Sequence, residues 1–227
     1  DVEPFIDRQG WRQFEDDFIR RIKIAKGRRR FRKLTVKQFL SRYTGAKRKR
    51  YERACARLAA ERIVAGIHAK VSMFVKFEKM NPLAKTRPDP RAIQHRTYAY
   101  AAALGMHLKP VEHFIYKLTM RQLRYGNDRS PLIGKSYSLR DRGPLLWSKW
   151  IKFINPVVVS LDMSRFDQHF GQDLLRFERR VYLALNGNPE FKRLLEMQRY
   201  NKGKTSLGAT YRADRRSKRV ASTSALG

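Results

Sequence analysis

The sequence has 227 residues, with 51 Lys and Arg against 20 Asp and Glu, which gives a net charge of +31. Hydrophobic residues make up 42% and aromatic residues 11%, so the composition excludes a disordered basic tail and indicates a folded chain with a polyanionic partner. The single cysteine, Cys55, excludes an intrachain disulfide framework and a cysteine-based zinc site, and no apolar run is long enough to span a membrane.

Residues 1–70 are predicted to be mostly helical. One apolar stripe recurs at steps of three and four residues, carried by Trp11, Phe14, Phe18 and Ile22. The basic run 28–33 breaks this pattern, and it indicates a solvated surface or a general RNA contact. A second helix is expected to begin at Thr35 and to end at Gly45, and a third helical pattern follows over 47–64.

The middle of the sequence changes in character. Residues 71–77 have the β-branched and aromatic content of a strand, and the proline-rich stretch 81–90 is predicted to be a loop. Helical patterns are expected over 98–118. Residues 126–142 are rich in Gly, Asn, Asp, Ser and Pro, which predicts a connection made mostly of loops.

The last part is predicted to begin with a buried strand over 156–162. A helix follows, with one apolar face made by Leu174, Phe177, Val181 and Leu185. Asn-Gly at 186–187 is expected to end this helix. The tail 201–219 is polar and basic, with turns expected at Gly203 and Gly208.

The segment 160–170 carries the sharpest chemical signal. Asp162 is placed at the end of the predicted strand, and Asp167 follows on the next turn, so both carboxylates can face one cavity. Such hard oxygen ligands suit Mg²⁺ in nucleotidyl transfer. The spacing alone is also typical of two surface or capping aspartates, but the apolar strand and the string Ser-Arg-Phe-Asp-Gln favour a catalytic site.

A second segment, 74–96, concentrates positive charge around the prolines of its loop. Its cations are Lys76, Lys79, Lys85, Arg87, Arg91 and Arg96. Because prolines stiffen the loop, less ordering is needed for these side chains to meet a triphosphate. Charge alone would also fit a solvated basic hairpin.

These two segments resemble motifs A and F of the RNA-dependent RNA polymerases of positive-strand RNA viruses, closest to the tombusvirus-like group. The resemblance implies that Asp162 binds the catalytic Mg²⁺ or Mn²⁺ ions and that Asp167 senses the ribose of the incoming nucleotide. It also implies that Lys79 and Arg91 contact the incoming triphosphate and the template. By the same resemblance, Lys76 and Lys85 would support these contacts, and Arg87 is a further candidate for binding nucleotide or RNA.

Two further likenesses are weaker. Residues 39–51 resemble an N-terminal fingers segment, where Lys47 or Arg48 would approach template phosphates. A helix cap with a solvated basic face fits these residues equally well.

The second weaker likeness is at the C-terminal end. The residues before Gly227 resemble motif B, but Arg219-Val220-Ala221 replaces the family's Ser-Gly-Asp and Thr223 replaces its Asn. This departure implies altered sugar selection, with Thr223 donating a hydrogen bond in place of the Asn.

The sequence has no Asp-Asp pair after residue 17, so the family's Gly-Asp-Asp turn and its metal ligands are absent from it. Two-metal catalysis needs these ligands, and the chain alone is therefore expected to be inactive. We expect either an incomplete polymerase or one divided between two polypeptides. A divided enzyme would expose an apolar palm edge that pairs with a second polypeptide carrying the missing turn.

The resulting expectation is an α+β protein, the fingers and partial palm of a right-hand polymerase. Its segments would be N-terminal helical fingers (1–70), fingers with the basic hairpin (71–150) and the first part of the palm (151–227). Its reaction would be RNA-templated RNA synthesis from ribonucleoside triphosphates, in the host cell cytoplasm, with any anchoring to replication membranes through other residues or partners. The alternative is a non-catalytic, basic RNA-binding protein or polymerase cofactor.

Overall fold

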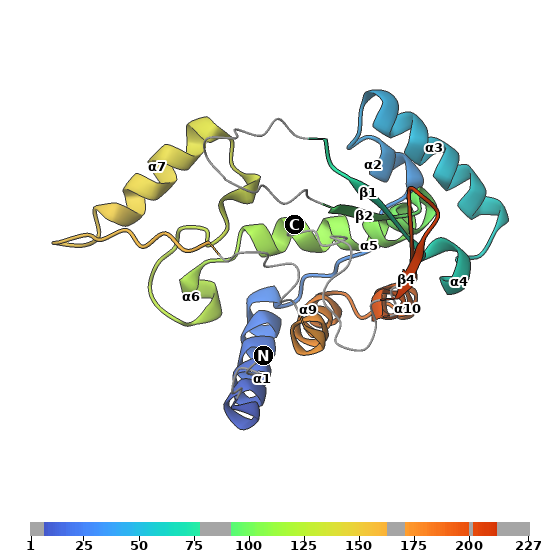
Figure 1. The fold of residues 1–227 in the computed structure, drawn as a ribbon. Helices are drawn as coiled ribbons and strands as arrows, with labels where there is room; N and C mark the ends of the chain where they lie inside the picture. Colours follow the sequence, from blue (N-terminus) through green and yellow to red (C-terminus); the bar gives the residue numbers. More distant parts are fainter. Residues whose placement is uncertain (1–6, 78–91, 163–170, 200–201, 213–227) are drawn as a thin grey trace. The chain divides into compact units, whose positions relative to one another are not determined.

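The computed structural model describes residues 7–77, 92–162, 171–199 and 202–212 (Figure 1). Both helices and strands occur, which confirms the predicted mixed α and β class. The chain divides into two compact units, each assembled from segments far apart in the sequence. Within the described ranges, the first unit comprises 7–33, 107–162 and 176–188, and the second comprises 34–77, 92–106, 171–175, 189–199 and 202–212.

The first unit is helical in the residues described. Its elements are α1 (Arg8–Lys26), the C-terminal part of α5 (Tyr98–Tyr116), α6 (Met120–Leu123), the 3-10 turn η1 (Gly134–Ser136), α7 (Leu139–Trp150) and most of α9 (Gln172–Leu185). Helix α1 begins where the Asp7 carboxylate accepts hydrogen bonds from the Gln9 and Gly10 amides, and it ends at Gly27 with φ of 56°.

The predicted apolar stripe of α1 packs against α9. The rings of Trp11, Phe14 and Phe18 surround that of Phe177, with centroids 5.3 to 5.8 Å apart. Beside these rings, the buried Glu15 carboxylate accepts a 2.7 Å hydrogen bond from Arg180. The pairing matters because a buried carboxylate without a partner would be strongly destabilising.

The second unit combines short helices with a four-stranded sheet. Its elements are α2 (Val36–Leu40), α3 (Gly45–Ala60), α4 (Ala65–His68), β1 (Val71–Val75), β2 (Ala92–Arg96), the N-terminal parts of α5 and α9, α10 (Pro189–Glu196), η2 (Met197–Arg199), β3 (Lys202–Thr205) and β4 (Thr210–Arg212). Helix α2 begins after Thr35, where the sequence predicted a helix start, and Thr35 and Gln38 form a reciprocal capping box there.

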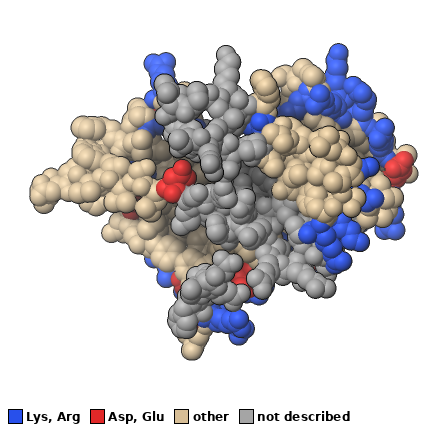
Figure 2. All heavy atoms as spheres, viewed as in Figure 1, with Lys and Arg blue, Asp and Glu red and all other residues tan. Residues whose placement is uncertain are grey.

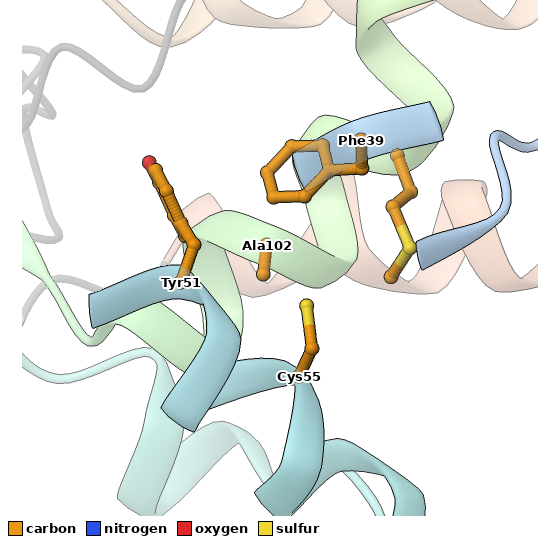
Figure 3. Packing of buried hydrophobic residues seen from close by; sticks show 5 residues of the cluster. Phe39, Tyr51, Cys55 and Ala102 are labelled. Atoms are coloured by element: carbon orange, nitrogen blue, oxygen red, sulfur yellow. The ribbon is translucent and has the colours of Figure 1, made fainter. Parts of the chain in front are cut away.

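The core of the second unit lies between α2, α3 and α5. Phe39, Tyr51, Cys55, Ala102 and Met106 form its buried cluster, shown in Figure 3. The Phe39 ring lies directly over Gly105 of α5, where an added Cβ would come within 2.8 Å of it. The helix–helix approach therefore requires glycine at that position.

The sheet has the strand order β2-β1-β3-β4. Strand β1 pairs antiparallel with β2 and parallel with β3, and β3 forms an antiparallel hairpin with β4. Gly208 lies in the hairpin turn with φ of 91°, as expected for a turn glycine. In the part of the chain that the structure describes, no helix is long and apolar enough to cross a bilayer.

Several predicted elements are corrected by the structure. Residues 156–162 form no strand and are mostly exposed, because nothing among the described residues pairs with their backbone or covers their side chains. Gly45 does not end a helix; it begins α3, which itself ends at Ala60, before residue 64. Gly203 lies inside β3, not in a turn. The predicted strand 71–77 and the helix after residue 170 are confirmed as β1 and α9.

Candidate nucleic-acid interface

The register of the sheet divides its side chains between a buried and an exposed face. On the inner face, the Tyr211 hydroxyl donates a 2.6 Å hydrogen bond to the Gln94 side chain. Gly203 lies so close to the Tyr211 ring that an added Cβ would be 2.1 Å from Cζ. The Arg96 guanidinium bonds to the Ala69 carbonyl and lies 5.5 Å from the Tyr100 ring centroid. This packing leaves the other face to solvent.

The outer face is defined by the residues that alternate with these. They are Ser72 and Phe74 of β1, Ile93 and His95 of β2, Lys202 and Lys204 of β3, and Thr210 and Arg212 of β4. All are exposed except Ile93, which is half-buried. None of these positions carries a carboxylate, so the outer face is uniformly neutral or basic.

Aromatic side chains and cations lie together on this outer face. The Phe74 side chain is 43% exposed, and its ring centroid is 5.7 Å from that of His95 on the neighbouring strand. Lys204 lies across β1 from His95 because both pair with Ser72. Exposed rings beside cations are the arrangement that binds single-stranded nucleic acid, since bases stack on rings and phosphates pair with cations.

Helix α3 adds a second basic surface to the same unit. Figure 2 shows Lys and Arg gathered in the region where Figure 1 draws α3. The predicted residues Lys47 and Arg48 are both exposed: Lys47 Nζ lies 5.3 Å from the Tyr43 ring centroid, and Arg48 forms a 2.8 Å ion pair with Glu52. The Arg50 guanidinium donates a 3.0 Å hydrogen bond to the Tyr98 hydroxyl.

Burial shifts the pKa of the groups beneath these surfaces. Desolvation lowers the pKa of the Arg96 guanidinium on the inner face of the sheet. Desolvation also raises the pKa of the Tyr211 and Tyr51 hydroxyls, and so both stay protonated hydrogen-bonding groups at neutral pH. Because Arg96 is buried, the positive charge that a ligand can reach comes from the exposed cations.

The structure places only some of the residues predicted for the site. Lys76 is exposed immediately after β1, in the second unit with Lys47 and Arg48. Asp162 is exposed at the end of the unpaired segment of the first unit. The other predicted residues lie outside the described residues: Asp167, Lys79, Lys85, Arg87, Arg91 and Thr223.

The metal site receives limited support from the described residues. Asp162 offers the oxygen ligand that Mg²⁺ prefers. Across the ranges that the structure describes, no group of three His, Cys, Asp or Glu side chains is placed to hold a metal ion. Asp162 therefore fits the chemistry of Mg²⁺ binding but does not by itself make a site.

Sequence reasoning did not identify the outer face of the sheet. Phe74 is predicted to lie in a strand and begins the basic segment 74–96, but its ring receives no role, and residues 202–212 are assigned only to a polar, basic tail. The sequence of β1, Val-Ser-Met-Phe-Val, does not alternate between polar and apolar residues, so it gave no clear signal for an exposed face. The pairing of β1 with β3, which brings Lys204 toward the rings, left no local trace in the sequence.

Comparison with known proteins identifies the family. A model described as viral RNA-dependent RNA polymerase matches residues 9–221. The chain is 41% identical over 166 residues to the RNA-directed RNA polymerase of Maize chlorotic mottle virus, covering 73% of this chain and 17% of that protein. It is 38% identical to the polymerase of Groundnut rosette virus, over 70% of this chain and 18% of the relative. It is 37% identical to the polymerase of Tobacco necrosis virus strain A, over 75% of this chain and 23% of that relative.

The chain thus belongs to the viral RNA-dependent RNA polymerase family, and the resemblance expected from motifs A and F is confirmed at that level. It spans about a fifth of the length of the curated relatives it matches.

Proposed function

We propose that the protein takes part in RNA-templated RNA synthesis for replication of a viral genome. The described units would form much of the fingers and the beginning of the palm of a right-hand polymerase. Family membership supports the reaction class, and the net charge of +31 suits a channel that holds RNA and triphosphates together. The host cell cytoplasm remains the predicted location.

The observation that carries this proposal is the outer face of the sheet. An unpaired template strand would stack bases on Phe74 and His95 while its phosphates pair with Lys202, Lys204 and Arg212. Double-stranded RNA would hide its bases from these rings, and so the arrangement favours a single strand. The face therefore suits a template presented base by base.

In the proposed reaction, the 3′ oxygen of the growing RNA attacks the α-phosphorus of a ribonucleoside triphosphate. The bond between the α-phosphorus and its bridging oxygen breaks, pyrophosphate leaves, and the hydroxyl proton passes to solvent. We propose that Lys76, Lys79 and Arg91 bind the triphosphate, supported by Lys85 and Arg87. Asp167 and Thr223 would position the ribose, while Lys47 and Arg48 would hold template phosphates.

Asp162 would hold Mg²⁺ or Mn²⁺, which neutralises phosphate charge when bound. One carboxylate is too few for two ions, so the remaining ligands would come from a Gly-Asp-Asp turn outside this sequence. We propose that this turn lies in the remainder of a longer polymerase or on a second polypeptide. The exposed apolar residues of 153–161, which precede Asp162, support this proposal.

A non-catalytic RNA-binding protein is the second candidate. It is favoured by the altered segment that resembles motif B and by the absence of a Gly-Asp-Asp turn from this sequence. Both candidates predict RNA binding that weakens with salt. Only the polymerase requires Asp162, so this residue discriminates between them.

The test is RNA synthesis by the polymerase that contains this chain, reconstituted with the Gly-Asp-Asp part. Asp162→Asn should lower the rate by at least about 100-fold, because loss of a metal ligand weakens metal binding and charge neutralisation together. Asp173→Asn, at another exposed aspartate, is the matched control and should retain activity. If Asp162→Asn changed neither RNA synthesis nor Mn²⁺ binding, the catalytic proposal would fail and the non-catalytic RNA-binding function would remain.

A further inference from the structure

A groove in the first unit is separate from the residues assigned above. It has a volume of about 320 Å³ and is lined mainly by Arg29, Phe31, Pro110, His113, Phe114 and Lys117. Arg29 and Phe31 belong to the basic run that interrupts the N-terminal helical pattern, and the others lie on α5 or immediately after it. Among the described residues, none that lines the groove carries a carboxylate.

The groove has an aromatic wall and a cationic rim. The rings of Phe31 and Phe114 lie with centroids 5.3 Å apart and planes inclined at 54°. The Arg29 guanidinium lies 5.6 Å from the Phe114 ring centroid, and a 3.0 Å hydrogen bond to the Ala25 carbonyl fixes its position. A guanidinium held beside a ring needs less further ordering to pair with a phosphate.

Two more polar side chains extend the rim. His113 and Lys117 are both exposed. They are four residues apart, so they lie on the same side of the chain near the C-terminal end of α5. The exposed side chains of Arg28, Arg30 and Arg32 continue the positive charge on either side of Arg29 and Phe31. The charge therefore extends beyond the groove as a track, which a small anionic ligand would not require.

We propose that this groove is a second RNA-binding site, which takes one unpaired nucleotide of single-stranded RNA. The base would lie against Phe31 and Phe114, and the adjoining phosphates would pair with Arg29 and Lys117. The volume suits a single nucleotide and not a duplex. The choice of RNA as the polyanion rests on the proposed function, but the placement of base and phosphate rests on the groove itself.

The experiment uses the full chain and a short single-stranded RNA that carries 4-thiouridine, crosslinked by light and mapped by mass spectrometry. Crosslinks should fall on the peptides that contain Phe31 and Phe114. Phe31→Leu keeps the apolar volume but removes a stacking ring, and it should lower the crosslink yield there about tenfold. An excess of abasic RNA should compete much more weakly than intact RNA.

Charge is tested with a matched pair. Lys117→Ala should reduce by about one the slope of log affinity against log salt for the groove crosslink. Lys23→Ala removes the same charge from an exposed position on α1 and should leave that slope unchanged.

Three outcomes would overturn the inference. Crosslinks confined to the strands of the second unit would exclude the groove while leaving the proposed function intact. The absence of crosslinks anywhere on the chain would count against both the groove and the proposed function. A groove that binds an acidic peptide but gives no RNA crosslink would be a protein-binding site.

Discussion

Phe74 supplies a stacking ring to the outer face of the sheet, and its replacement tests that role. Phe74→Leu retains an apolar side chain but removes the ring, so affinity for single-stranded RNA should fall about tenfold. The slope of log affinity against log salt should stay the same, because no charge changes. Fluorescence anisotropy with a labelled oligonucleotide measures both quantities.

Phe153→Leu is the control, since Phe153 is also exposed but belongs to the first unit and not to the basic strands. An equal loss of affinity in both variants would show that Phe74 has no specific part in binding.

Gly203 is required by the close approach of Tyr211. In Gly203→Ala the new Cβ would be 2.1 Å from Tyr211 Cζ, so the ring must move and weaken its hydrogen bond to Gln94. We expect the free energy of unfolding to fall by about 1–3 kcal/mol, as for other overpacked sites. Urea denaturation of the chain measures this change.

The control is Gly66→Ala, where an added Cβ meets nothing within 4 Å. It should be neutral or slightly stabilising. If the Tyr211 ring causes the loss, Gly203→Ala should be less harmful in a Tyr211→Ala background. An equal loss in both backgrounds would assign the effect to the backbone of β3.

At the scale of elements, Asp128 connects the loop after α6 to α7. Lys149 of α7 and Lys152 donate to its carboxylate at 3.1 and 2.5 Å, and the Ser130 amide donates at 2.8 Å. The bonds from Lys152 and Ser130, with that from Lys149, hold the pKa of Asp128 well below its ordinary value. A lowered pKa in the folded state stabilises the fold above the unfolded pKa, and the benefit is lost as pH falls through the folded pKa.

Asp128→Asn should therefore lower the urea midpoint at pH 7. The difference between the variant and the original chain should shrink as the pH is taken below about 4, where the carboxylate begins to protonate in the unfolded state. Denaturation curves at pH 7 and pH 3 test this. A difference of equal size at both values would mean that shape, not charge, explains the contribution of Asp128.

The sequence predicted elements whose signal is local. The α1 stripe and the strand β1 were predicted because three-to-four-residue spacing and β-branched content report directly on helix and strand. Residues 156–162 have the same strand composition, yet they form none, since a strand also needs a neighbour to accept its hydrogen bonds. The β3–β4 hairpin was missed because Lys-Gly-Lys-Thr lacks that composition and is held by pairing with β1.

The same distinction applies to the candidate site. The charges of Lys47 and Arg48 could be read from the sequence, because a basic run on a helix is exposed wherever the helix lies. The outer face of the sheet depends on the alignment of Ser72 with His95 and Lys204 from two distant segments. Such a non-local register cannot be inferred from composition or spacing within one segment.

For the whole molecule, the exposed apolar segment 153–161 is where we expect the proposed Gly-Asp-Asp part of the polymerase to contact this chain. Ile154 is 98% exposed and Val157 is 82% exposed. Val158 and Val159 are each 73% exposed. An apolar patch of this kind marks an interaction surface, and the relatives are several times longer than this chain. We expect the segment to pair as a strand, with Asp162 at its end, when the proposed Gly-Asp-Asp part is present.

Hydrogen exchange followed by mass spectrometry tests this pairing. The amides of 156–162 should exchange rapidly in the chain alone and become protected when the Gly-Asp-Asp part is supplied. Val158→Asp should change the stability of the chain alone by less than about 0.5 kcal/mol, as expected for an exposed position. In the reconstituted polymerase it should reduce association and RNA synthesis, because the carboxylate would be buried without a partner. Rapid exchange in the active polymerase would show that this segment stays open and that Asp162 reaches the metal without a supporting strand.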